Sequence, residues 1–154
     1  MKKGLPALFY LFLFLFVFLA DRITKFLAVT SKVNNYKVNS FLSFDLVFNR
    51  GISWGMFDYK DSTVFLVIGL LIAAITVGLF FYAVMRFKSG YLIIGETLAV
   101  AGSVSNIFDR IFYGGVIDFI VLSFGKWSWP VFNIADFFIV IGVFILSLSV
   151  WTKE

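Results

Sequence analysis

The sequence predicts an all-α membrane protein with four transmembrane helices and a small β-rich loop region on the extracytoplasmic side. Of the 154 residues, 61% are hydrophobic, whereas soluble domains usually contain about 45–50%. Four apolar stretches also approach the roughly 20 residues that an α-helix needs to cross a bilayer core. We expect a single domain over residues 1–154.

The four helices are expected at about 5–28, 63–85, 91–112 and 131–151. The first follows Lys2 and Lys3, so it also resembles the basic and apolar regions of a signal peptide. That stretch extends past Asp21 to the length of a span, however, and three further spans follow it. We therefore interpret it as a transmembrane helix. Pro130 precedes the fourth helix, and proline is well tolerated at a helix start.

The connecting loops differ in length. The link over residues 86–90 is short and predicts an antiparallel hairpin, whereas the loops at about 29–62 and 113–130 are long and lie together on the other side. Residues 37–48 are rich in Val, Phe and Leu with partial alternation, which predicts a strand.

Basic residues favour one orientation in the membrane. The side with the short link contains Lys2, Lys3, Arg86, Lys88 and Lys153, which places both termini in the cytoplasm. The long loops contain more basic residues in total, so charge alone leaves the orientation open.

Composition excludes several chemistries. The chain has no Cys and no His, which excludes thiol nucleophiles, Cys/His metal sites and a Ser-His-Asp triad. We expect no metal and no cofactor, so a hydrolase here would use carboxylates or Lys. The net charge of +4 comes from scattered residues. This predicts no nucleic-acid partner and suits contact with membrane lipids.

Polar residues gather in five places that the predicted topology brings to one membrane face. Charged groups in apolar helices are costly, so each cluster needs an explanation. Glu96, early in the third span, is the exception at the opposite end. The clusters are Asp21 with Arg22 and Lys25; Asn49 to Gly51; Asn106 with Asp109 and Arg110; Asp118; and Asn133 with Asp136.

Asp118 and Asp136 have no Lys or Arg within four residues in sequence. Two carboxylates placed together in apolar surroundings share a proton. One can then accept a proton from water while the other protonates an amide carbonyl. Asp21 and Asp109 have Lys25 and Arg110 within reach as ion-pair partners, but spacing alone leaves Asp109 open as a member of the pair.

Two other classes fit the same residues. A proton- or cation-coupled transporter could use membrane carboxylates, with Glu96 as a relay group. Clustering at one face, rather than along a path across the membrane, argues against transport. A structural scaffold could use the polar residues only to pair helices.

Five segments resemble the motifs of one family, in order and over nearly the whole chain. Residues 21–25 are similar to D-x-x-[ST]-K, and Asn49 to Gly51 with Trp54 to N-x-G-x-x-[FW]. Residues 102–110 (GSVSNIFDR) are similar to G-A-x-G-N-x-x-D-R, 116–119 to V-V-D-F, and 132–136 to F-N-x-A-D. The sequence therefore resembles the lipoprotein signal peptidases, or signal peptidase II.

This resemblance implies roles for particular residues. Asp118 and Asp136 would be the catalytic pair, and Asp109 would support the site with Arg110. The other residues implied as substrate-binding or supporting are Asn49, Gly51, Asn106, Asn133, Ala135, Asp21, Lys25 and Gly102. Ser105 and Ala101 stand where the family has glycine, and Ile52 and Ser53 where it often has alanine. The first two should thicken the third span.

The resemblance also implies a function. We expect an intramembrane aspartyl endopeptidase that removes signal peptides from diacylglyceryl-modified prolipoproteins, cutting just before the lipid-bearing Cys. It would be a multi-pass protein of the bacterial cytoplasmic (inner) membrane, with its active site near the extracytoplasmic face. Globomycin-like cyclic peptides would bind it as inhibitors.

Overall fold

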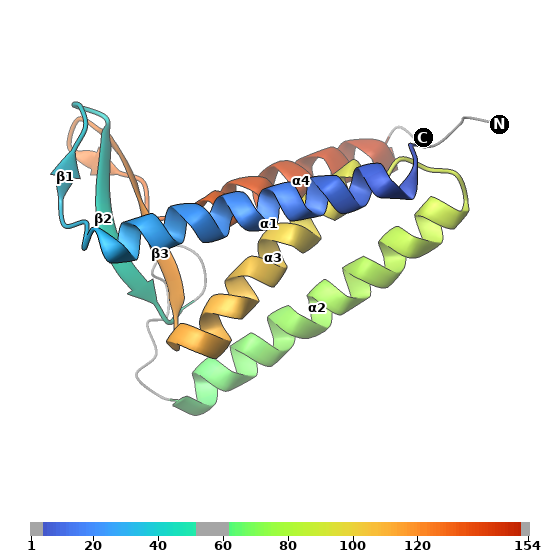
Figure 1. Cartoon of the computed structure of the whole chain (residues 1–154), viewed down its shortest axis with the longest axis horizontal. Helices are drawn as coiled ribbons and strands as arrows, with labels where there is room; N and C mark the ends of the chain where they lie inside the picture. Colours follow the sequence, from blue (N-terminus) through green and yellow to red (C-terminus); the bar gives the residue numbers. More distant parts are fainter. Residues whose placement is uncertain (1–4, 52–61, 152–154) are drawn as a thin grey trace.

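A computed structural model describes residues 5–51 and 62–151. Four long helices form a bundle with a small sheet at one end (Figure 1). The helices are α1 (Ala7–Thr30), α2 (Ser62–Lys88), α3 (Ile94–Tyr113) and α4 (Ile134–Trp151). The expectations for Lys2, Lys3, Trp54 and Lys153, and for the residues that replace the family alanines, fall outside the described residues.

The helix bounds differ slightly from those expected. Helix α1 begins and ends two residues later, and α2 continues to Lys88. Helices α3 and α4 each begin three residues later than expected. Gly90, at φ +83°, ends the α2 segment, and Asn133 caps the start of α4.

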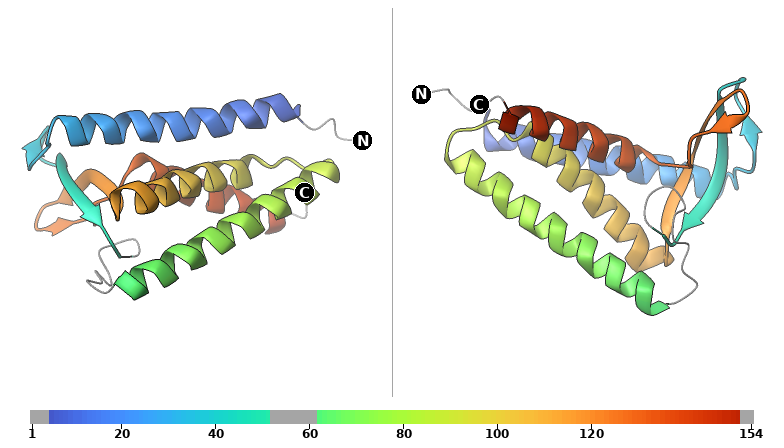
Figure 2. Two further views of the ribbon diagram at one scale, coloured as in Figure 1. Left: turned by 60° about the horizontal axis from the view of Figure 1, so that its bottom comes forward. Right: turned by 180° about the vertical axis from the view of Figure 1, so that it is seen from behind.

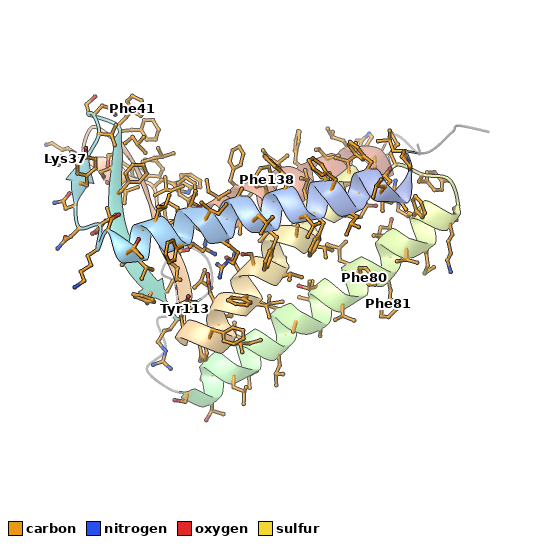
Figure 3. The ribbon with its side chains drawn as sticks, in the orientation of Figure 1. Lys37, Phe41, Phe80, Phe81, Tyr113 and Phe138 are labelled. Atoms are coloured by element: carbon orange, nitrogen blue, oxygen red, sulfur yellow. The ribbon has the colours of Figure 1, made fainter. Side chains whose placement is uncertain are left out.

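Helix α3 is the centre of the bundle, in contact with α1, α2 and α4 (Figure 2). A continuous run of α3 from Gly95 to Gly102 is buried. The outer helices instead expose most of their apolar side chains, and on α2 Phe80 and Phe81 are 51% and 60% exposed (Figure 3). This inverted distribution suits a lipid environment.

Small residues allow α3 and α4 to approach closely. A Cβ atom on Gly142 would lie 2.5 Å from the carbonyl oxygen of Gly95. A Cβ atom on Gly102 would lie 2.6 Å from the carbonyl oxygen of Ala135. Glycine permits this backbone contact because it has no side chain, as is common between membrane helices. The contact at Gly102 places the first turn of α4 directly against α3.

Three of the four expected spans, α1, α2 and α4, are long and apolar enough to cross a membrane among the described residues. Helix α3 does not reach that apolarity. It contains Glu96, Asp109 and Arg110 besides Asn106, and its mostly buried surface faces protein rather than lipid. The chain is therefore a mostly helical membrane protein with three clear candidate spans.

The sheet joins the two long loops. Its antiparallel strands lie in the order β1 (Tyr36–Lys37), β2 (Leu42–Asn49), β3 (Val116–Phe124) and β4 (Trp127–Ser128). The prediction of one strand over 37–48 is wrong in part, because the chain turns between β1 and β2. Asn39 Oδ1 accepts the N–H groups of Phe41 and Leu42 there, as asparagine commonly does in turns.

The register of β2 and β3 positions functional groups. Asn49 pairs with Val116, and Val47 pairs with Asp118. Two loops that are distant in the sequence thus meet beside Asp118.

Candidate active site

A cavity of about 220 Å³ lies where the sheet meets the bundle. Side chains from α2, α3, β2, β3 and α4 line it. Its polar wall consists of Asn49, Asn106, Arg110, Asp118 and Asp136, and the remaining wall of Ile72, Ser103, Val116 and Ile139. The structure thus places the two predicted catalytic carboxylates on one cavity.

Amide groups hold both oxygens of Asp118, which is 2% exposed on β3. Asn133 Nδ2 donates to its Oδ1 at 2.7 Å, and Asn49 Nδ2 donates to its Oδ2 at 2.9 Å. Asn49 is itself oriented by the Gly51 N–H, which donates to Asn49 Oδ1. These donors compensate the carboxylate for much of its lost water.

A reciprocal helix cap holds Asp136. Its N–H donates to Asn133 Oδ1 at 2.8 Å, and its Oδ2 accepts the Asn133 N–H at 3.3 Å. This is the arrangement of a capping box, here built from Asn and Asp. Asn106 Nδ2 donates to the other oxygen, Oδ1, at 2.8 Å. The F-N-x-A-D segment therefore both starts helix α4 and places the Asp136 carboxylate in the wall of the cavity.

The surroundings of Asp118 change its acidity. Burial, which disfavours the charged form, and the nearby charge of Asp136 raise the pKa of Asp118 to about 7. The hydrogen bonds from Asn49 and Asn133 and the charge of Lys25 oppose this rise. Near neutral pH the Asp118 carboxyl is therefore protonated in a large share of molecules.

This raised pKa predicts a pH dependence of stability. Below about pH 4, Asp118 is protonated in both the folded and the unfolded chain. Because its folded pKa is about 7, its contribution to folding is lost as pH rises toward and through 7. Asp118→Asn removes this contribution. Thermal unfolding in detergent from pH 5 to 8 should show the melting temperature of the native chain falling relative to that of the variant. A constant difference across this range would contradict the raised pKa.

Behind the cavity lies a buried ion cluster of Asp21, Arg22, Lys25 and Asp109. Lys25 Nζ lies 2.7 Å from Asp21 Oδ2 and 2.6 Å from Asp109 Oδ2. Arg22 Nη2 lies 2.6 Å from Asp109 Oδ1 and 3.3 Å from Asp21 Oδ2. The expected Asp21–Lys25 pair is thus present, and α1 is joined to α3.

The alternative pairing of Asp109 with Arg110 is not found. Successive residues of an α-helix point about 100° apart, so Asp109 faces α1 while Arg110 faces the cavity. Arg110 Nη2 donates to the carbonyl oxygen of Gly51 at 2.6 Å. Asp109 also accepts the Ile117 N–H at 3.2 Å, is fully buried and does not line the cavity.

Asp21 connects the ion cluster to α4. Its Oδ1 accepts the Ala135 N–H at 2.8 Å, which satisfies one of the free N–H groups at the start of that helix. Its Oδ2 accepts the hydroxyl of Ser105 at 2.6 Å. Besides the bulk expected where the family has glycine, Ser105 therefore brings a hydroxyl that donates to a buried acceptor. Ala101 is fully buried against Val17 and Leu98.

Replacing Asp21 by Asn should strongly destabilise the fold. The change removes one carboxylate from a buried cluster of two cations, and breaking such a pair typically costs about 3–5 kcal/mol. Thermal or denaturant unfolding in detergent measures this cost. Asp45→Asn is the matched control, because Asp45 lies outside the cluster and, among residues 5–51 and 62–151, accepts one hydrogen bond, from the Asn35 N–H at 3.2 Å. Equal stability of the two variants would contradict the cluster's structural role.

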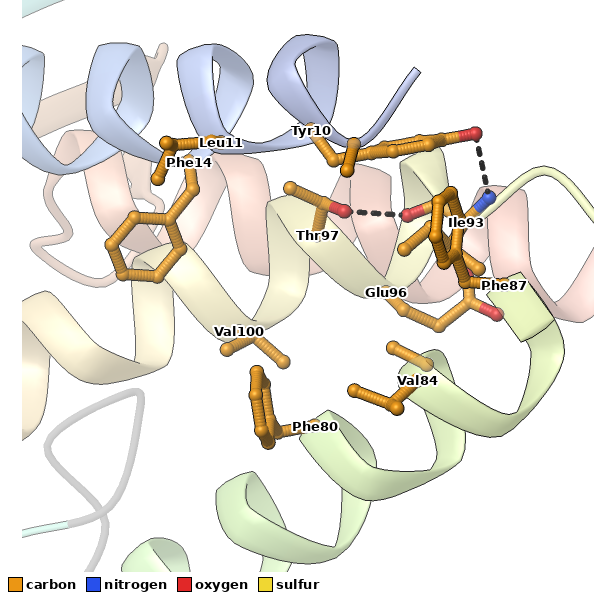
Figure 4. Close-up of a pocket in the computed structure, with 12 residues that line it drawn as sticks. Tyr10, Leu11, Phe14, Phe80, Val84, Phe87, Ile93, Glu96, Thr97 and Val100 are labelled. Carbon is orange, nitrogen blue, oxygen red and sulfur yellow. Dashed lines mark hydrogen bonds between the residues drawn. The ribbon is translucent and has the colours of Figure 1, made fainter. Parts of the chain in front are cut away.

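A second cavity, of about 350 Å³, lies at the opposite end of the bundle between α1, α2 and α3 (Figure 4). Its lining is almost entirely apolar apart from Tyr10, Glu96 and Thr97. Glu96 is 1% exposed and pairs with Arg86, whose Nε lies 3.2 Å from Glu96 Oε1. Glu96 thus has a structural partner at its own end of the bundle.

Most of the predicted site residues lie in the cavity, in the ion cluster or at the contact of Gly102 with Ala135. Gly51 and Asn133 are hydrogen-bonded to residues that line the cavity. The sequence places Arg22 in the first polar cluster but gives it no supporting role, whereas in the structure it pairs with Asp21 and Asp109. Sequence reasoning missed Ile72 and Ile139, whose apolar side chains gave no signal. No group of three or more His, Cys, Asp or Glu side chains that could hold a metal ion occurs within residues 5–51 and 62–151.

Fold and site together define a class of protein. It is a membrane protein in which two carboxylates, hydrogen-bonded by asparagine amides, share one cavity at the end of an apolar helix bundle. This arrangement is suited to acid–base hydrolysis. Comparison with known proteins narrows the class. The family model described as signal peptidase (SPase) II matches residues 13–152.

Relatives and solved structures agree with this match. The lipoprotein signal peptidase of Clostridium novyi is 35% identical over 87% of this chain and 91% of its own length. That of Aquifex aeolicus is 35% identical over 91% of this chain and 84% of its own. A bacterial membrane enzyme solved by the in meso method at 2.3 Å resolution superposes with a TM-score of 0.80 at 26% identity, covering 99% of this chain and 93% of its own. The chain belongs to the signal peptidase II family and is thus a protease.

Proposed function

We propose that this chain is an aspartyl endopeptidase that removes signal peptides from diacylglyceryl-modified prolipoproteins, cutting just before the lipid-bearing Cys. The observation that carries the proposal is the shared cavity of Asp118 and Asp136. Each carboxylate accepts an amide donor from an asparagine, and no other described carboxylate lines this cavity.

The mechanism follows from two carboxyl groups in different protonation states. The ionised one accepts a proton from a water molecule as that water attacks the scissile carbonyl carbon. The protonated one donates its proton to the carbonyl oxygen. When the tetrahedral intermediate collapses, the carboxyl that took the proton of water donates it to the leaving amine, and the other carboxylate takes a proton back from a hydroxyl of the intermediate. The C–N bond breaks and both groups return to their starting protonation states. With a pKa of about 7, Asp118 is suited to hold the proton at the start.

The remaining cavity residues would bind the substrate. Asn49, Asn106 and Arg110 line its polar end beside the carboxylates. Asn133 is outside the lining and donates to Asp118. Ile72 and Ile139 come from α2 and α4 and would contact apolar parts of the substrate or of a globomycin-like cyclic peptide. The lipid on the substrate would hold the scissile bond at this depth, which raises its effective concentration.

In the proposed topology all four helices cross the bacterial cytoplasmic membrane as one domain, with both termini in the cytoplasm. Helix α3 would cross while surrounded by the other three helices, which shields its polar residues from lipid. The cavity and sheet would then lie near the extracytoplasmic face. The transporter alternative has less support, because its relay candidate Glu96 pairs with Arg86.

The test is cleavage by the purified protein in detergent. A diacylglyceryl-modified prolipoprotein should be shortened on a gel, and mass spectrometry should show the lipid-bearing Cys as the new N-terminus. The same prolipoprotein without its lipid is the matched control and should stay intact. No cleavage of the modified substrate by folded protein would contradict the proposal.

A further inference from the structure

Three asparagine side chains donate to the two carboxylates of the cavity. Each can do so only when the NH₂ end of its amide, and not the oxygen, faces the carboxylate. Nδ2 of Asn49 and of Asn133 donates to Asp118, and Nδ2 of Asn106 donates to Asp136. If one of these amides turned by 180°, its oxygen would face a carboxylate oxygen. Two acceptors would then oppose each other and a hydrogen bond would be lost.

A donor on the amide oxygen prevents such a turn. For Asn49 this donor is the Gly51 N–H at 2.9 Å, and for Asn133 it is the Asp136 N–H at 2.8 Å. Backbone N–H groups cannot accept, so these two orientations follow from the local chain path.

Asn106 differs, because no backbone group holds its oxygen. The Asn106 Oδ1 atom accepts Lys25 Nζ at 2.8 Å and, at 3.2 Å, Asn133 Nδ2. Nδ2 of Asn133 also contacts Asp118 Oδ1 and the carbonyl oxygen of Ile117. Asn133 Nδ2 is therefore the longer and shared donor to Asn106 Oδ1, and Lys25 Nζ is the shorter, charged donor to the same oxygen.

Lys25 is well suited to this task. An ammonium group has three donors and no acceptor, and the three contacts of Lys25 Nζ are to Asp21, Asp109 and Asn106. The residue is 1% exposed, so water does not compete for these positions. The Asp21 and Asp109 carboxylates hold the ammonium in place, which leaves its third donor for Asn106.

We propose that Lys25 is a positioning residue that fixes the amide of Asn106, so that the Asn106 NH₂ group faces Asp136. This inference rests on the proposed function, because it concerns the same carboxylate pair. Lys25 touches neither carboxylate through a hydrogen bond or ion pair that the described structure contains. Its charge reaches Asp118 from a distance, and its one hydrogen bond toward the pair passes through the amide of Asn106.

The test replaces Lys25 by Gln, whose amide can either donate to or accept from Asn106. The turned form of Asn106 then becomes accessible. We expect kcat for cleavage of the diacylglyceryl-modified prolipoprotein to fall by about 10- to 100-fold. This is less than the roughly 10²–10³-fold typical of losing a donor to the reacting atoms themselves, because Lys25 acts through Asn106. KM should change by less than about threefold, because the cavity wall is preserved.

A double-mutant cycle separates positioning from a general loss of structure. In an Asn106→Ala background there is no amide to orient, so adding Lys25→Gln should lower kcat much less than it does in the native background. The remaining effect would come from loss of the Lys25 charge near Asp118. A loss of kcat from Lys25→Gln that is equally large in both backgrounds would overturn the inference. So would an unchanged kcat in the folded Lys25→Gln single variant.

If the Lys25→Gln single variant does not fold, the charge-balanced pair Lys25→Gln/Asp109→Asn replaces it. This pair is compared with Asp109→Asn alone, which keeps the hydrogen bond from Lys25 to Asn106. The double-mutant cycle of Lys25→Gln with Asn106→Ala is then measured in the Asp109→Asn chain. A kcat effect that depends on Asn106 supports the inference, and one independent of Asn106 overturns it. The native chain runs beside every variant, so that its failure to cleave would count against the proposed function rather than against the role of Lys25.

Discussion

Asp118→Asn and Asp136→Asn should each lower the rate of prolipoprotein cleavage by about 10³-fold or more. General acid–base groups typically contribute about 10²–10⁴-fold, and the two carboxyls act as a unit. An amide can neither accept the proton of the attacking water nor donate a carboxyl proton to the carbonyl oxygen. The measurement is a time course of substrate shortening by purified protein in detergent.

Two comparisons make this result specific. Both variants should remain folded, because the new amide oxygen keeps one of the two hydrogen bonds that each carboxylate accepts. Loss of the other typically costs only about 1–3 kcal/mol. Asp45→Asn changes a carboxylate outside the cavity and should leave cleavage within about twofold of the native rate. Full activity in either cavity variant would exclude the proposed mechanism. If a variant is instead less stable and its folded fraction cleaves at the native rate, a scaffold role for the carboxylates would be favoured.

Gly142→Ala should destabilise the bundle by about 3 kcal/mol or more. The new methyl group would lie 2.5 Å from the carbonyl oxygen of Gly95 and 2.6 Å from the Ala99 nitrogen. Both atoms belong to backbone that cannot move without separating α3 from α4. Overpacking commonly costs about 1–3 kcal/mol, and two backbone clashes place this change at or above the upper end. Thermal unfolding in detergent would measure the loss.

Gly78→Ala is the matched control for this change. Gly78 lies on α2 with no atom within 4 Å of the position that its Cβ would take. Alanine favours helix over glycine by about 1 kcal/mol, so this variant should be as stable as the native chain or slightly more stable. Equal melting temperatures for Gly142→Ala and Gly78→Ala would show that the α3–α4 contact does not need glycine.

Spacing along the chain favours Asp118 and Asp136 as the proposed catalytic pair but leaves Asp109 open, and only the family resemblance completes the choice. Asp118 and Asp136 lack a nearby cation along the chain, whereas Asp21 and Asp109 have one. This difference can be seen directly from the spacing of charged residues along the chain. The spacing could not say which cation each of the other two carboxylates uses. Asp109 pairs with Arg22 and Lys25 of another helix rather than with its neighbour Arg110.

The strand that carries Asp118 was less predictable. The sequence predicts that residues 116–124 lie in a long loop of a β-rich region, without a strand named there, and in the structure they form β3. Isolated strands have no hydrogen-bond partners, so β3 exists because β2 lies beside it. Pairing between segments about 70 residues apart leaves no short-range signal.

The amino-acid sequence alone determined the apolar bundle, the absence of Cys and His chemistry, and the motifs that carry the family resemblance. These depend on composition and on spacing within single helices, which are local properties. Tertiary structure decided the partners: the amide donors on each carboxylate, the ion cluster behind them and the contact of Gly95 with Gly142. Such contacts depend on how separate elements approach, and side-chain directions at that approach are fixed only when the whole bundle is packed.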